Sequence, residues 1–284
     1  MSRLFLLGYH RRVKRLPVTT FFVLAFLVTW VVWVPRAMGA DWAVQIGQIW
    51  AYGPAIAALL AAALTGGRPT FRQLVSGLDK WRLGWTWYAV IVIGPLGLAL
   101  VTAAVNLALG GSWKEGLPDA LSEPLPIILL LIFILTITDG LGEELGWRGF
   151  ALPRMLEQGN AFRASFVLGL IWALWHAPLL WTEGNALEGS HLWLLIVRLP
   201  ATSVIFTWVF RHTAGSIVAA SLLHGALNVF SVAPPTSGEP LTPALITMAL
   251  HWLVALGLVV YAGHRRLDGL PREQSSTQSP LGLQ

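Results

Sequence analysis

The feature that most constrains this chain of 284 residues is its succession of long apolar segments. A helix needs about 20 apolar residues to cross a hydrocarbon layer of about 30 Å. Inside that layer the backbone must satisfy its own hydrogen bonds, and a helix does so within one segment. We expect eight spans, at residues 17–36, 42–65, 84–110, 124–148, 163–182, 190–210, 213–232 and 241–263. The sequence therefore predicts an all-α polytopic membrane protein, with about eight transmembrane helices around a polar intramembrane cavity.

The composition agrees with a bilayer location. Only 12% of the residues are charged, against about 25% in an average soluble domain. The 15 Trp residues suit the membrane interface, where the ring meets apolar material and the N–H meets polar groups. The absence of cysteine excludes disulfides, a thiolate nucleophile and Cys-ligated metals. The net charge of +5 does not indicate a nucleic-acid partner, because the basic residues occupy loop positions rather than one patch.

The distribution of basic residues predicts the orientation in the membrane. When the eight spans are followed in order, all but three of the 19 Lys and Arg residues fall at one end of the helices. The opposite end carries only Arg36 and Lys114, and Arg198 lies within a span. Because short loops rich in Lys and Arg stay inside, both termini are predicted to be cytoplasmic. A bacterial plasma membrane is the expected location. Cleavage of 17–36 as a signal peptide is disfavoured, because its apolar core is too long.

The chain is expected to form one integral membrane domain, at residues 1–266, with its functional motifs between 124 and 232. Apolar residues at helical spacing over 71–78, with basic residues among them, indicate a short interfacial helix. The segment 267–284 is rich in Ser, Gln and Pro and is predicted to be a disordered cytoplasmic tail.

Polar residues gather in three of the predicted spans, and ionisable groups within a membrane are functional-site candidates. The fourth span contains Asp139, Glu143, Glu144 and Arg148, the fifth contains Trp172 and His176, and the seventh contains His224 and Asn228. Glu144 and Arg148 are four residues apart, so they share a helix face and can pair. Glu143 is rotated by about 100° from Glu144, which leaves its carboxylate free for chemistry. We expect the three helices to meet around one cavity open to the cytoplasm.

These residue types suit the hydrolysis of a peptide bond. A carboxylate can take a proton from water, and an imidazole can share that proton transfer. A second imidazole, together with a carboxamide, can donate hydrogen bonds to the developing oxyanion. No Ser or Cys nucleophile is paired with a base in these motifs.

The three motifs, Glu-Glu-x-x-x-Arg, aromatic-x-x-x-His and His-x-x-x-Asn on successive apolar segments, resemble those of the CPBP family of intramembrane glutamic endopeptidases. That family includes type II CAAX prenyl proteases and bacteriocin-processing proteins. The resemblance implies that Glu143 activates water with assistance from His176, and that His224 and Asn228 form the oxyanion hole. It also implies that Glu144 and Arg148 support the site. Trp172 departs from the Phe that is most frequent at its position, and its wider ring could reshape the pocket.

Four further residues are assigned or left open at this level. We expect Trp172 and Asp139 to support the site, Asp139 as an accessory polar group, and His251 to be structural. Arg198 could snorkel, pair with Glu143 or Glu144, or line a substrate path.

Several alternatives stay open at this level. Glu143, His176 and His224 could bind Zn²⁺ as a catalytic ion, although the His-Glu-x-x-His helix typical of many zinc proteases is absent. The chain could also be a non-catalytic scaffold or immunity protein. A further alternative is a transporter that uses Asp139, Glu143 and His176 as a proton relay. The expected partners are lipid and a membrane-bound protein or peptide substrate, without nucleic acid or a required cofactor. The sequence carries no prediction of substrate identity or oligomeric state.

Overall fold

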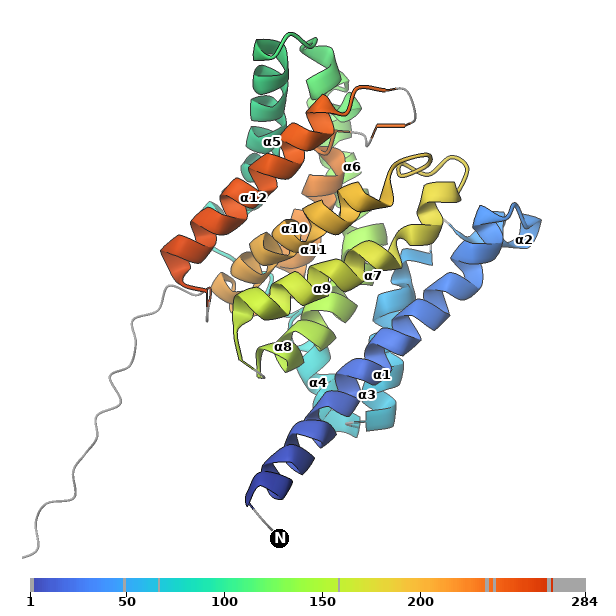
Figure 1. Cartoon of the computed structure of the whole chain (residues 1–284), viewed down its shortest axis with the longest axis vertical. Coiled ribbons are helices and arrows are strands. Elements are labelled where there is room, and N and C mark those ends of the chain that lie inside the picture. Colours follow the sequence, from blue (N-terminus) through green and yellow to red (C-terminus); the bar gives the residue numbers. More distant parts are fainter. Residues whose placement is uncertain are drawn as a thin grey trace, which may run out of the picture.

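The computed structural model describes residues 3–47, 50–65, 67–157, 159–232, 235–236, 239–264 and 267. These ranges contain helices and loops without strands, so the predicted all-α class is confirmed (Figure 1). The α-helices are α1 Arg3–Ala37, α2 Asp41–Gly47, α3 Gly53–Thr65, α4 Gly67–Val75, α5 Trp85–Ala108, α6 Leu125–Leu135, α7 Gly142–Glu144, α8 Leu152–Leu156, α9 Ala161–Trp175, α10 Leu192–His212, α11 Ile217–Val229 and α12 Thr242–Ala262. Apart from Leu267, the predicted tail lies outside the described residues.

Six helical segments of the described chain are long and apolar enough to cross a membrane: Val18–Ala37, Trp85–Ala108, Leu125–Leu156, Ala161–Trp181, Leu192–His212 and Thr242–Ala262. Each coincides with a predicted span, which supports an integral membrane protein. The other two predicted spans, 42–65 and 213–232, contain the apolar helices α3 and α11, of 13 residues each. At 1.5 Å per residue, such a helix is about 20 Å long. The count of eight complete spans is therefore not confirmed.

The two short helices have local causes. The predicted span 42–65 is interrupted after Gly47, and a single 3-10 turn at Trp50–Tyr52 precedes α3. The predicted span 213–232 begins late because Gly215 has a φ of +79°, which a right-handed helix does not allow. Ser216 then caps α11 by accepting a hydrogen bond from the backbone N–H of Ala219.

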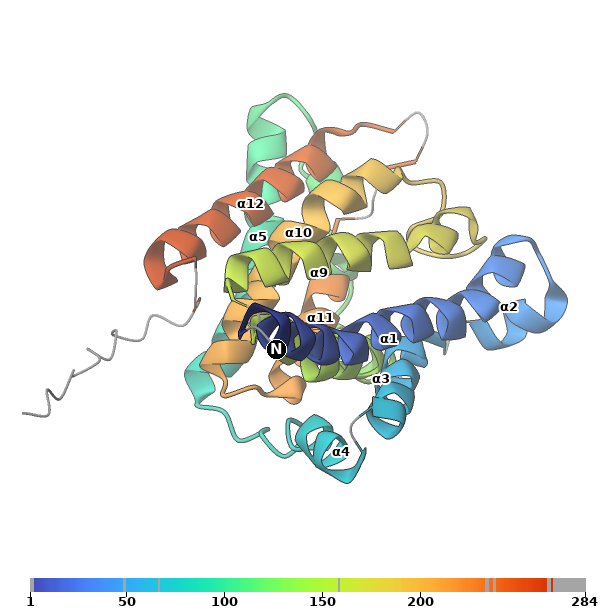
Figure 2. The same ribbon diagram turned by 60° about the horizontal axis from the view of Figure 1, so that its bottom comes forward.

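Small residues bring neighbouring helices close together. In α3, Ala57, Ala58 and Ala61 are completely buried, and α3 packs along α1 (Figure 2). Between α9 and α10, a Cβ on Gly169 would lie 2.4 Å from the Cα of Pro200, so only glycine fits there. Helices associate in a membrane largely through such close backbone packing.

The helix that carries the two glutamates is irregular where it reaches them. Residues 125–156 are helical throughout, but Thr136–Leu141 and Leu145–Ala151 are π-helical. The helix continues for eight residues beyond Arg148, where the predicted span ends. The Tyr52 hydroxyl donates to the carbonyl of Ile137 at 2.7 Å, inside the first π-helical segment. Such segments are frequent at functional sites, because the extra residue re-aims the side chains that follow.

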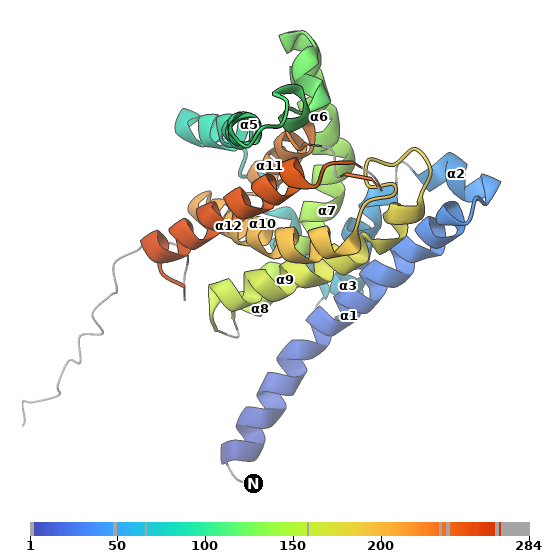
Figure 3. The ribbon, with the colours of Figure 1, turned by 45° about the horizontal axis from the view of Figure 1, so that its top comes forward.

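The loops between the helices lie at two opposite ends of the molecule. In Figure 1 the N-terminus lies at the bottom, while the loops that join α5 to α6, α9 to α10 and α11 to α12 lie toward the top and the right. Figure 3 shows the same division, with α9, α10 and α12 running alongside one another from those loops to the opposite end. We refer to the end formed by the described residues 36–47, 50–52, 109–124, 182–191, 230–232, 235–236 and 239–241 as the loop end, and to the other as the basic end.

Candidate active site

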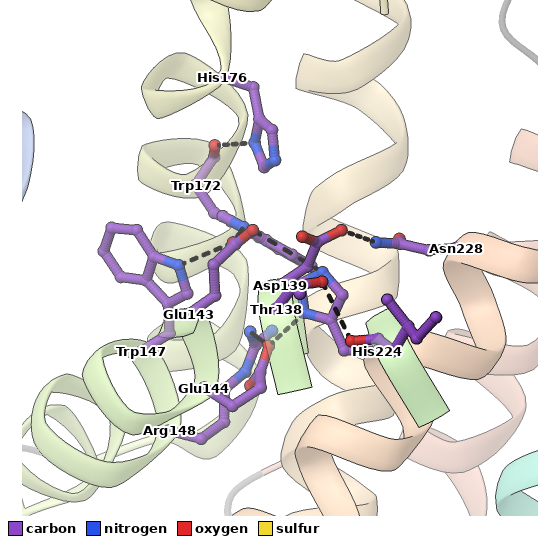
Figure 4. A network of polar contacts seen from close by, with 11 residues as sticks. Thr138, Asp139, Glu143, Glu144, Trp147, Arg148, Trp172, His176, His224 and Asn228 are labelled. Atoms are coloured by element: carbon purple, nitrogen blue, oxygen red, sulfur yellow. Dashed lines mark hydrogen bonds and ion pairs between the residues drawn. The ribbon is translucent and has the colours of Figure 1, made fainter. Parts of the chain in front are cut away.

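Glu143 lies in α7, between the two π-helical segments, and is 4% exposed. Its Oε2 accepts hydrogen bonds from two indoles, at 2.6 Å from Nε1 of Trp172 and at 3.2 Å from Nε1 of Trp147 (Figure 4). Two donors on one oxygen fix the carboxylate and leave Oε1 as its other polar atom. The sequence analysis named Trp172 as a site-supporting residue without this bond, and it did not identify Trp147. The i,i+4 spacing of Glu143 and Trp147 was the available signal.

Glu144 points away from Glu143 and forms the predicted ion pair. Nη1 of Arg148 donates to Oε1 of Glu144 at 2.8 Å, and both side chains are completely buried. The guanidinium carbon of Arg148 lies 4.6 Å from the ring centroid of Trp172 and 4.2 Å from that of Phe206. Arg148 thus contacts Glu144 of its own helix and connects this helix to α9 and α10 through the two aromatic rings.

His224 joins the two glutamates. Its Nδ1 lies 2.9 Å from Oε1 of Glu144, and because a carboxylate oxygen accepts, Nδ1 carries the proton of this bond. Its Nε2 lies 3.8 Å from Oε1 of Glu143, too far for a direct hydrogen bond but close enough for one small group to contact both. Glu144 therefore orients the imidazole so that its other nitrogen faces Glu143.

His176 is the C-cap residue of α9. Its Nδ1 lies 2.8 Å from the carbonyl of Trp172, so Nδ1 donates and a neutral ring keeps Nε2 as an acceptor. Its ring centroid lies 4.9 Å from that of Trp175, which confines the ring from one side. His176 and Glu143 line the same cavity.

Asn228 and Asp139 form a second polar pair. Nδ2 of Asn228 donates to Oδ2 of Asp139 at 3.2 Å, which leaves the second amide N–H of Asn228 available. Asn228 is exposed within the chain and lines the cavity together with Asp139. The sequence treated Asp139 as an accessory polar group, and the bond to Asn228 gives it a definite neighbour.

One cavity of about 590 Å³ connects these residues. Its wall includes Glu143, Trp172, His176, His224 and Asn228, together with apolar residues of α6, α10 and α11. The cavity volume falls in the range of sites that bind small ligands or short peptide segments. Glu144 and Arg148 lie behind this wall, outside the cavity lining.

The cavity does not extend to the basic end of the molecule, although the sequence predicted an opening there. The segments 67–83 and 149–163, which carry basic residues, contribute nothing to its described lining. At the loop end, its lining includes Arg36, Asp119, Ala120, Gly184, Asn185, Ala186, Leu187, Ser231 and Val232. The expectation of a cavity open toward the basic loops was therefore wrong. Alternating apolar spans fix which loops share an end, but the sequence alone does not show where the helices separate.

Arg198 also lines the cavity, on α10. Within the described residues no hydrogen bond or ion pair joins its guanidinium to Glu143 or Glu144, which were its suggested partners. His251, which the sequence interpreted as structural, donates from Nδ1 to the carbonyl of Thr247 at 2.7 Å and borders the same space.

The zinc hypothesis requires Glu143, His176 and His224 to converge on one ion. In the part of the chain that the structure describes, no three His, Asp or Glu side chains are grouped as metal ligands. Glu143 is held at Oε2 by two indole donors, and His224 is held at Nδ1 by Glu144. These bonds leave Oε1 of Glu143 and Nε2 of His224 unused, and chelation of the purified protein tests the zinc hypothesis directly.

Comparison with known proteins adds an independent observation. Residues 125–230, which contain both glutamates, both histidines and Asn228, match the family described as "Type II CAAX prenyl endopeptidase Rce1-like". A protein of Methanococcus maripaludis named "CAAX prenyl protease 2" is 24% identical over 172 residues, which are 57% of this chain. The match covers 60% of the length of that relative. The resemblance inferred from the three motifs is thereby confirmed.

Proposed function

We propose that this chain, which matches the Rce1-like type II CAAX prenyl endopeptidases over its site-bearing helices, is an intramembrane endopeptidase that uses Glu143 to activate water. The observation that carries the proposal is the position of Glu143. Its carboxylate lines a cavity large enough for a peptide segment, and two indoles hold it from one side. The family match supports a peptidase of a membrane-associated protein or peptide.

In the proposed reaction, Glu143 accepts a proton from a water molecule. The water oxygen then attacks the carbonyl carbon of the scissile bond, and the carbonyl oxygen becomes an oxyanion. His176, with Nε2 as an acceptor, shares the proton transfer. Breakage of the C–N bond completes the reaction when the leaving nitrogen receives a proton from Glu143 or a histidine.

The oxyanion needs donors that are already in place. The second amide N–H of Asn228, whose first is held by Asp139, serves this role. His224 serves it from Nε2 when that nitrogen carries a proton, because Nδ1 stays bonded to Glu144. Glu144 and Arg148 contribute by holding His224 in this orientation rather than by contacting the substrate.

The test is a cleavage assay with purified protein in detergent, using a farnesylated CAAX reporter peptide and a diverse peptide library. We expect cleavage by the wild type that survives a chelator. Removing the general base in Glu143→Gln should lower the rate by about 10²–10⁴-fold while the protein still folds. Glu123→Gln is the matched control, because Glu123 is exposed and does not line the cavity.

A wild-type rate in Glu143→Gln would refute Glu143 as the base. Cleavage that a chelator stops and zinc restores would replace the glutamate mechanism with a metal-dependent one. If well-folded wild type cleaves nothing in the library, the non-catalytic scaffold becomes the better account of this fold.

A further inference from the structure

The cavity and the basic loops lie at opposite ends of the molecule. The lining includes Arg36, at the end of α1, and the loops around Asp119, Ala186 and Ser231, all at the loop end. Toward the basic end the cavity stops at a layer of side chains in which Glu144, Trp147 and Arg148 are completely buried. A group reaching Glu143 through the lined space therefore comes from the loop end.

The basic residues mark the other end. Within the described helices and loops, the basic end carries Arg68, Arg72, Lys80, Arg82, Arg154, Arg163 and Arg211. The start of α1, at the same end, contains Arg3, Arg11, Arg12, Lys14 and Arg15. Among its described residues, the loop end carries only two basic ones, Arg36 and Lys114. An excess of Lys and Arg in short loops keeps those loops in the cytoplasm.

We infer that the cavity opens to the extracytoplasmic side of the membrane, and that its substrate is a peptide segment presented there. The identity of the substrate as a peptide rests on the proposed function, whereas the side of the opening does not. The substrate class is then an exported or membrane-anchored polypeptide with a segment at the outer surface. A prenylated C-terminus in the cytoplasm would meet the sealed end of the helices.

The shape of the lining agrees with access from this side. Asn185 and Leu187 stand at the rim in the loop between α9 and α10, and Leu131 and Leu135 continue the wall along α6 toward Glu143. From Leu135 to Glu143 the helix advances eight residues, which is about 12 Å. A peptide segment entering at the rim thus has a mainly apolar path to the carboxylate.

Cysteine labelling tests this inference without a known substrate, because the chain contains no cysteine. Three single variants report three places: Ala186→Cys at the rim, Leu135→Cys in the cavity wall, and Ser76→Cys on an exposed surface of the basic end. Each is expressed in bacterial cells and treated with a small, charged, membrane-impermeant methanethiosulfonate. Labelling is measured in intact cells, in permeabilised cells and after full denaturation.

We expect the Ala186 and Leu135 variants to be labelled equally in intact and permeabilised cells. The Ser76 variant should lose labelling in intact cells and regain it on permeabilisation. The reverse pattern would overturn the orientation. If the Ala186 variant is labelled while the Leu135 variant stays unlabelled in both intact and permeabilised cells, then no open path leads from the rim to the site, and the inference is wrong. None of these results depends on proteolysis, so failure here is distinct from failure of the proposed reaction.

Discussion

Replacement of Arg148 by alanine tests whether the buried ion pair holds the site together. Arg148 is completely buried, donates to Glu144 at 2.8 Å, and lies over the rings of Trp172 and Phe206. Alanine removes the cation and both ring contacts. Glu144 then remains a buried carboxylate whose only described partner is the imidazole of His224.

The expected cost follows from this burial. Removing one partner of a buried ion pair typically destabilises a protein by about 3–5 kcal/mol, because the other charge is left uncompensated. Each kcal/mol lowers the Tm of a protein of similar size by roughly 2–4 °C. We therefore expect Arg148→Ala to lower the Tm by roughly 6–20 °C. We also expect it to lose cleavage activity, because His224 is no longer held in position.

Unfolding can be followed by the fluorescence of the 15 Trp residues in one detergent. Arg72→Ala is the control, since Arg72 is exposed at the basic end and should change stability by less than about 0.5 kcal/mol. The double variant Glu144→Gln/Arg148→Met removes both charges and keeps an acceptor for His224, so it should recover most of the lost stability. A wild-type Tm in Arg148→Ala, or a double variant as unstable as the single one, would refute the reasoning.

Two further substitutions probe the carboxylate and the packing. Trp172→Phe keeps an aromatic ring but removes the 2.6 Å hydrogen bond to Glu143. A bond to a charged group contributes about 1.5–3 kcal/mol to stability, so the Tm should fall by roughly 3–12 °C. The cleavage rate should fall as well, because one indole instead of two then holds Glu143; an unaltered Tm and rate would contradict this role. Gly169→Ala should lower the Tm, because the new Cβ would meet the backbone of Pro200. Gly257→Ala is the control and should leave the Tm unchanged, because no atom lies within 4 Å of its Cβ. Equal Tm values for the two variants would show that α9 and α10 can separate without cost.

Local spacing explains the parts of the site that the sequence predicted. Glu144 and Arg148 pair because residues four apart share a helix face, and this pairing survives even in an irregular helix. The bond between His224 and Glu144 could not be predicted in the same way, because 80 residues separate them. The same holds for Trp172 and Glu143, which are 29 residues apart and meet only when α9 packs against the glutamate helix.

By itself, the sequence determined that the chain is helical and membrane-embedded, because apolar runs of this length can satisfy their backbone in lipid only as helices. It also identified the polar residues, since each is conspicuous against an apolar span. Only the tertiary structure decided how long α3 and α11 are, which indoles hold Glu143, and at which end the cavity lies. These depend on how helices distant in sequence pack together, and hydrophobic periodicity carries no information about that packing.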